Sequence, residues 1–271
     1  MSKIQRHHSE LQLLFSELFQ TKDNKKLIDY LLSNSDLPSR RANLELAKAF
    51  TTVIEENLYN YEEILWNFIT SIIKITPNHA PTNNPQEFLP FCGTWAVGTL
   101  GASSEIHYRD SLFHLKELSK DPRWRIREAV AKGLNELITL RSVETIKEIE
   151  TWILKDQWLL MRAVVTCVAA PKLLQDEHIG KQALELHKKV LTQIEASKNR
   201  KSEEFKTLRK GLAYSLSVVV QAIPERGFEY LKELMTSQDD DILWILKQNL
   251  KKNRLVKNFP SKVKEITREL K

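Results

Sequence analysis

Apolar residues recur with a helical period along most of the chain. Within residues 11–19 they fall at positions i, i+3, i+4, i+7 and i+8, which places them on one face of an amphipathic α helix. We find no stretch with the apolar–polar alternation of a half-buried β strand. The helical spacing predicts further helices over these ranges: 44–58, 62–75, 111–119, 124–138, 143–154, 158–171, 179–195, 204–222, 227–235 and 242–255. The pattern therefore predicts an all-α fold.

Residues 76–93 are the main interruption of this pattern. The segment holds four prolines, and proline both lacks a backbone N–H and disfavours the helical conformation of the residue before it. We expect a long loop here, between two parts of one array. Glycine is scarce, with 7 residues in 271, against a usual content of ~7%. That scarcity argues against sandwiches, barrels, propellers and Gly-rich phosphate loops.

An internal repeat favours a stacked array over a simple bundle. Four segments place a basic residue six positions after an acidic one, in front of an apolar helix. They begin at Asp121, Asp156, Glu203 and Asp241, and so lie 35, 47 and 38 residues apart. We expect a shorter helix before each of them. Helix pairs that repeat at about 40 residues are typical of HEAT and armadillo arrays.

The chain resembles the HEAT-repeat superfamily. DPRWRIREAVAKGLNEL looks like the second helix of a HEAT unit, and the resemblance covers residues 110–257 well and the first hundred loosely. It implies a right-handed α-solenoid, or superhelix, of about five to six HEAT-like helix pairs. The expected organisation is a single array over 1–271, with these parts: irregular repeats at 1–75, the loop at 76–93, regular repeats at 94–257 and a basic helix or tail at 258–271. The sequence is also similar to a bacterial HEAT-repeat family with no assigned activity, in these segments: 37–50, 121–134, 208–227 and 241–255.

The acidic and basic residues of the four segments form a candidate ladder. The resemblance implies contacts between neighbouring repeats for this set: Asp121, Arg127, Asp156, Glu203, Arg209 and Asp241. A carboxylate at a helix N-terminus can also cap free backbone N–H groups. Two alternatives stay open. The basic side chains could line one surface instead, and a shift of one residue would put Met161 rather than Arg162 at the ladder position.

The second helices also carry a candidate binding stripe. A helical wheel of 123–137 gives an apolar packing face and an opposite face with Trp124 and Lys132, and in the arrays that the chain resembles this second helix lines the concave surface. The stripe comprises Trp124, Arg125, Lys132, Trp158, Arg162, Lys206, Lys210, Trp244, Lys247 and Lys251. Lysines would neutralise phosphates, and indoles would stack on bases or sugars. The alternative is that each tryptophan packs under the preceding loop.

Charge is concentrated at the end of the sequence. The formal net charge is +6, and residues 246–271 hold nine basic and two acidic side chains, a net +7. A local excess attracts polyanions, although a solvated lysine-rich surface is the alternative. Nucleic acid and an acidic protein segment are therefore the two candidate partners. We expect non-catalytic binding or scaffolding through the concave face, since solenoids most often act as scaffolds.

A DNA-repair role is the alternative function. Residues 37–50 are similar to a stretch of the HEAT-like alkylpurine DNA glycosylases, and Trp95 could stand where these enzymes place a tryptophan on the DNA-facing groove. These enzymes need a carboxylate a few residues later, but the first acid after Trp95 is Glu105. We therefore predict no catalytic residue. We also predict no cofactor and no metal site, although His107, Asp110 and His114 share one helical side.

The expected setting is cytoplasmic. No segment approaches the ~20 apolar residues of a membrane span, and the N-terminal residues lack an apolar signal region. Cys92 and Cys167 cannot form a disulfide framework, and we expect both to be buried small apolar residues. We expect a monomer without a membrane partner.

Overall fold

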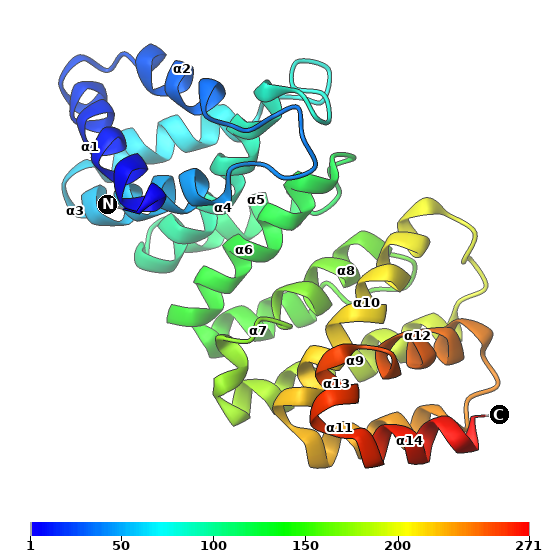
Figure 1. Ribbon diagram of the computed structural model, residues 1–271. Helices are drawn as coiled ribbons and strands as arrows, with labels where there is room; N and C mark the ends of the chain where they lie inside the picture. The colour runs from blue at the N-terminus through cyan, green and yellow to red at the C-terminus, as the bar shows by residue number, and fades with distance from the viewer. Residues whose placement is uncertain (1, 271) are drawn as a thin grey trace. The chain divides into compact units, whose positions relative to one another are not determined.

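The computed structural model describes residues 2–270, and within them every regular element is a helix (Figure 1). The all-α prediction is confirmed. The chain divides into two compact units, Met1–Leu140 and Arg141–Lys271, which we call unit 1 and unit 2. No helix between residues 2 and 270 is long and apolar enough to cross a bilayer.

Unit 1 is built around a helix that is buried on all sides. Its elements are α1 (Lys3–Thr21), α2 (Lys25–Ser33), α3 (Leu44–Ile73), a short 3-10 helix (Pro85–Glu87), α4 (Phe88–Ser103), α5 (Tyr108–Leu118) and α6 (Trp124–Leu140). The central helix is α4, which packs against both α3 and α6. It contains no charged residue, and all of its residues except Ser103 are buried.

A glycine pair sets the distance between α4 and α6. A Cβ atom on Gly98 would lie only 2.2 Å from the backbone of Gly133, so the two helix backbones touch at a point where no side chain fits. The sequence AVGTLG at 96–101 predicts tight helix packing of this kind, and the contact confirms it. The predicted packing face of α6, from Ile126 to Leu137, is buried as expected.

The predicted loop at 76–93 is too long. The helix α4 begins at Phe88 and includes Pro90 in its first turn. Proline is tolerated there because the first N–H groups of a helix have no partner within the helix. The loop is therefore limited to the residues before the short helix at Pro85–Glu87.

Two further helices differ from the prediction. A single helix, α3, covers the predicted ranges 44–58 and 62–75 up to Ile73, with a kink where Tyr61 leaves helical geometry (φ −134°, ψ 27°). The kink marks the break that the sequence pattern places between the two ranges. The helix α2 was not predicted, and its 9 residues are too few for a strong period.

Unit 2 is arranged around α10. Its elements are α7 (Ser142–Glu150), α8 (Trp158–Cys167), a 3-10 helix (Leu173–Gln175), α9 (Glu177–Ala196), α10 (Glu203–Ala222), α11 (Pro224–Leu234), α12 (Asp240–Leu250), α13 (Asn253–Asn258) and α14 (Pro260–Glu269). The helix α10 packs against α8, α9, α11, α12 and α13. The predicted helix at 242–255 is divided into α12 and α13, and the basic segment at 258–271 includes the helix α14.

Buried polar side chains join α10 to its neighbours. Asn249 of α12 accepts a hydrogen bond from the Ser217 N–H (2.8 Å) and donates to the Leu212 carbonyl (3.0 Å). His187 of α9 is fully buried and lies 2.8 Å from the Ser215 hydroxyl. Its other ring nitrogen is 2.7 Å from the carbonyl of Ala183. Burial lowers the pKa of His187 to about 4, so the ring is neutral in the folded protein at pH 7.

Candidate functional site

The predicted binding stripe divides into three groups by exposure. Its exposed members are Trp124, Lys206, Lys210, Lys247 and Lys251, its half-buried members are Lys132 and Trp244, and its buried members are Arg125, Trp158 and Arg162. The stripe therefore does not present all ten side chains to a ligand.

The three buried side chains require a correction. Trp158 packs edge-to-face on Phe205, with ring centroids 5.2 Å apart. The Cγ atom of Arg162 lies against Gly211 of α10, and Arg125 forms a buried ion pair with Glu87 of 2.9 Å. Neighbouring elements thus cover these positions, which a helical wheel of one helix cannot reveal.

A pocket of about 440 Å³ in unit 1 is the candidate functional site. Trp124, Glu128 and Lys132 line it from α6, where a spacing of four residues puts them on one face. The remaining lining residues come from the loop before α3, from α3 itself, from α4 and from α6: Arg40, Arg41, Ala42, Leu44, Phe91 and Arg125. Segments distant in the sequence thus meet around one cavity.

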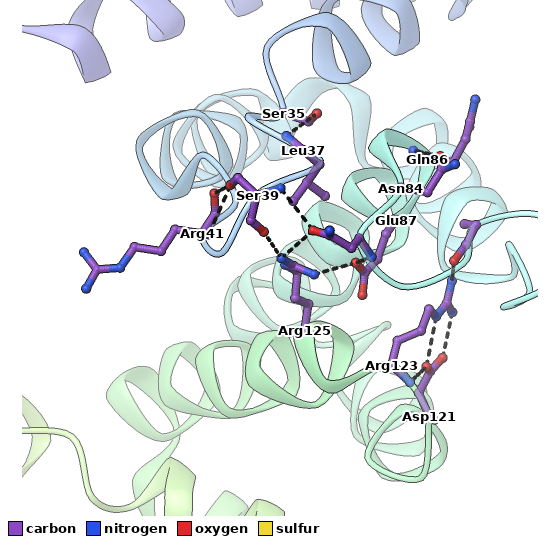
Figure 2. A network of polar contacts seen from close by, with 12 residues as sticks. Ser35, Leu37, Ser39, Arg41, Asn84, Gln86, Glu87, Asp121, Arg123 and Arg125 are labelled. Atoms are coloured by element: carbon purple, nitrogen blue, oxygen red, sulfur yellow. Dashed lines mark hydrogen bonds and ion pairs between the residues drawn. The ribbon is translucent and has the colours of Figure 1, made fainter.

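A buried polar network fixes the loop that borders the pocket (Figure 2). The Arg125 guanidinium donates to the Ser39 carbonyl (2.5 Å), to the Asn83 side-chain oxygen (3.2 Å) and to Glu87 (2.9 Å). The same Asn83 oxygen accepts from the Ser39 N–H (3.0 Å), and the Asn83 N–H donates to Glu87 (2.8 Å). Arg125 is 3% exposed and Glu87 is 0% exposed. These residues therefore hold the pocket wall in place and are not free for a ligand.

Two arginines of this loop remain available. The hydroxyl of Ser39 bonds to the backbone of Arg41 in both directions, at 2.5 and 3.1 Å. The side chain of Arg41 extends away from the Arg125 network (Figure 2). Within residues 2–270, neither the Arg40 nor the Arg41 guanidinium has a hydrogen bond or ion pair, and both side chains are exposed. They can therefore bind an external anion without first breaking an internal contact.

Trp124 presents an indole at the same pocket. It is 44% exposed, and the guanidinium of Arg125 lies 4.4 Å from its ring centroid. Because Arg125 is held by Glu87 and the loop, it supports the indole from the protein side. The tryptophan is thus oriented in advance and keeps accessible ring surface.

Lys132 also belongs to a second cluster, whose residues come from α3, α4 and α6. Lys132 lies 4.3 Å and Lys48 5.6 Å from the Trp95 ring centroid. The carboxylate of Glu136 accepts from the Trp95 indole N–H (3.1 Å) and pairs with Lys48 (3.0 Å). Burial lowers the pKa of Lys132, while the charges of Glu128 and Glu136 act in the opposite direction.

Unit 2 carries its own pairs of basic and aromatic side chains. The guanidinium of Arg209 lies 4.3 Å from the Trp244 ring centroid. Tyr214 is 51% exposed, and Arg254 lies 4.3 Å from its ring centroid. Of the exposed lysines, Lys206 pairs with Glu203 at 2.6 Å. We place the candidate site in unit 1, where basic and aromatic side chains line a pocket together.

The ladder residues have varied partners. Arg209 of α10 pairs with Asp241 of α12 at 2.5 Å, and this contact joins the two helices. Asp156 accepts a hydrogen bond from Ser197 (2.6 Å). Asp239, rather than Asp241, provides the N-cap of α12.

The first ladder segment is held locally. Asp121 forms an ion pair with Arg123 of 2.7 Å. Arg127 donates to the backbone carbonyls of Asp121 (2.5 Å) and Pro122 (2.9 Å). These bonds fix the turn that leads into α6, and with it the position of Trp124.

Both cysteines, and the two histidines beside Trp66, pack within the structure, which is typical of a structural role. Cys92 and Cys167 are fully buried, and burial raises the pKa of each thiol, which keeps both protonated. His107 stacks on Trp66 with centroids 4.1 Å apart, and His114 lies 5.7 Å from the same ring. Among residues 2–270, no group of three or more His, Cys, Asp or Glu side chains is placed to hold a metal.

Sequence reasoning missed several pocket residues. Arg40, Arg41 and Phe91 are in segments that show no repeat signal. Glu136 was missed because the expected carboxylate was sought on the same helix as Trp95, whereas it comes from α6. The one sequence signal for the two arginines was the segment 37–50, which contains both and is similar to a stretch of the alkylpurine DNA glycosylases.

Comparison with known proteins gives no functional assignment. No family model and no curated protein matches the chain. Crystal structures of two engineered proteins from the Northeast Structural Genomics Consortium align with it. One is 13% identical with a TM-score of 0.29, over 88% of this chain and 97% of that chain. The other is 12% identical with a TM-score of 0.35, over 93% and 98%. Scores at this level support neither a shared fold nor a shared function.

Proposed function

We propose that the chain is a HEAT-like α-solenoid that binds nucleic acid without catalysis, and that the unit 1 pocket provides a principal contact. The observation that carries the proposal is the exposed Trp124 indole beside the unpaired guanidinium groups of Arg40 and Arg41. Cations that track a phosphate backbone, next to an aromatic ring, are the combination used by single-strand binding surfaces. The repeat of about 40 residues supports the solenoid.

The charge around the pocket favours a polyanion. Arg125 and Glu87 neutralise each other as an ion pair. The other charged lining residues are Arg40, Arg41 and Lys132 against Glu128, which leaves a net +2. Such an excess raises the local concentration of anionic ligands.

The test is a fluorescence-anisotropy titration of labelled single-stranded and duplex DNA at several salt concentrations. The observed affinity should fall with salt because bound counterions are released from DNA. The double variant Arg40→Gln/Arg41→Gln should bind more weakly. If both arginines contact phosphate, the slope of the logarithm of the binding constant against the logarithm of the salt concentration should be smaller in magnitude by about 1.4 to 1.8.

The matched control is Lys3→Gln/Lys25→Gln, which removes the same charge from exposed positions of unit 1 that do not line the pocket. Equal losses in both double variants would show only a general charge effect. If no DNA binds at low salt, the proposal is wrong. If an acidic peptide binds through these arginines and DNA does not compete, the partner is a protein.

The contact between Trp95 and Glu136 favours a second candidate, which is base release from alkylated DNA. A carboxylate can stabilise the oxocarbenium-like transition state of glycosidic bond cleavage, and Glu136 brings one next to Trp95. We propose this activity only as the alternative, since Glu136 also pairs with Lys48. The measurement is release of alkylated base by the wild type and by Glu136→Gln. Release unchanged by Glu136→Gln would exclude the role of this carboxylate.

A further inference from the structure

The pocket of unit 1 has the size of a small-molecule site. Its volume of about 440 Å³ lies within the range of ~300–1,000 Å³ typical of ligand pockets. A groove that follows only a phosphate backbone needs no such cavity. The pocket is therefore large enough for a ligand group that enters the protein.

The lining suits a planar ring that bears polar edges. Leu44 and Phe91 supply apolar surface, and the Trp124 indole supplies a stacking face. Apolar walls do not replace the water around a phosphate, so they disfavour a phosphate in the interior. A nucleobase matches such walls because both of its faces are apolar and aromatic.

The carboxylate of Glu128 adds selectivity to this lining. It lies on α6 one turn after Trp124 and one turn before Lys132. A carboxylate repels phosphate, but it accepts hydrogen bonds from the exocyclic amino groups of adenine, cytosine and guanine. Thymine has no such amino group.

We infer that this pocket takes one unpaired nucleobase, stacked on Trp124 and selected for an exocyclic amino group by Glu128, while Arg40 and Arg41 bind the flanking phosphates. The inference rests on the proposed nucleic-acid function and names its ligand. A base inside a duplex is stacked on both faces, so it must be unpaired, bulged or single-stranded to enter a pocket. Arg125 is a positioning residue here, because it touches Trp124 and the loop instead of the ligand.

The experiment compares three labelled duplexes of one sequence by anisotropy: fully paired, with one bulged adenine and with one bulged thymine. The adenine bulge should bind about tenfold more tightly than the paired duplex, which corresponds to one base stacked on an aromatic side chain. The thymine bulge should bind more weakly than the adenine bulge. Trp124→Ala should remove the preference for bulged over paired DNA, because the stacking face is lost.

Two variants complete the design. Glu128→Gln should reduce the preference for adenine over thymine, because an amide oxygen accepts a weaker hydrogen bond than a carboxylate. Tyr59→Ala is the matched control, since Tyr59 is the most exposed aromatic residue of unit 1 at 97% and does not line the pocket. It should change none of the affinities.

Each outcome separates the inference from the proposed function. Equal binding of paired and bulged duplexes would overturn the inference and leave nucleic-acid binding standing. A bulge preference that survives Trp124→Ala would also overturn it. If no duplex binds but adenosine monophosphate alone does, the pocket is a nucleotide site and the proposed function fails.

Discussion

The buried ion pair between Arg125 and Glu87 supports a quantitative prediction for Arg125→Met. Both side chains are almost inaccessible, at 3% and 0% exposure. The substitution leaves the Glu87 carboxylate with one hydrogen bond among the described residues, from the Asn83 N–H. Removing one partner of a buried pair typically costs about 3–5 kcal/mol. We expect a loss of unfolding free energy of this size, because an uncompensated charge stays buried.

Adding Glu87→Gln to Arg125→Met tests this cause directly. The amide oxygen of glutamine can still accept from the Asn83 N–H, and the buried negative charge is gone. The double variant should therefore be more stable than Arg125→Met alone, even though it carries one more substitution. A simple count of lost contacts would predict the opposite order, with the double variant less stable than Arg125→Met.

Urea unfolding followed by circular dichroism measures both effects. Arg41→Met is the control, because Arg41 lies in the adjoining loop and its exposed guanidinium has no partner among residues 2–270. It should change stability by no more than about 0.5 kcal/mol. If Glu87→Gln destabilises the Arg125→Met protein further, the reasoning from buried charge is refuted.

Three further predictions concern packing and titration. Gly98→Ala should lower the free energy of unfolding in urea by about 1–3 kcal/mol or more, because the added Cβ meets the backbone of Gly133. Gly211→Ala should be neutral or stabilising, because its Cβ would lie 3.5 Å from the nearest side-chain atom. Equal effects of the two substitutions would contradict this reasoning. His187 has a pKa of about 4 in the folded protein, below its unfolded value of ~6.5. The free energy of unfolding should therefore fall by up to about 3 kcal/mol as the pH drops from the unfolded to the folded pKa. Urea titrations at several pH values should show that His187→Leu reduces this pH dependence. A double-mutant cycle on Arg209 and Asp241 should give a coupling free energy of only about 0.5–1 kcal/mol, since the side chains are partly exposed at 32% and 19%. A coupling near zero would mean that water screens the ion pair.

The period of apolar residues was sufficient to predict the all-α class and most helix positions. It succeeds where one face of a helix is buried, as in α6, because burial then repeats every three to four residues. It fails for α4, whose sequence is apolar on every side and has no polar face to contrast with. The start of α4 at Phe88 was also hidden by Pro90, since a proline in the first turn resembles a proline in a loop.

The candidate site was predictable only in part. Trp124 and Trp158 both begin a helix, but Phe205 covers Trp158 while Trp124 keeps 44% of its surface exposed. A single helix does not show which loop or neighbour lies above it. Arg125 illustrates the same limit, because Ser39 and Glu87, its covering partners, are distant in the sequence.

The all-round burial of α4 has a consequence for the protein while it is being synthesised. Residues 88–103 contain no charged side chain, and α3 leaves the ribosome before them. The second covering helix, α6, begins only at Trp124 and ends at Leu140. Until it emerges, one side of α4 has no native partner, and such exposed apolar surface is prone to aggregation. We therefore expect nascent chains that end before residue 124 to depend on chaperones, and those that extend past residue 140 to be released from them.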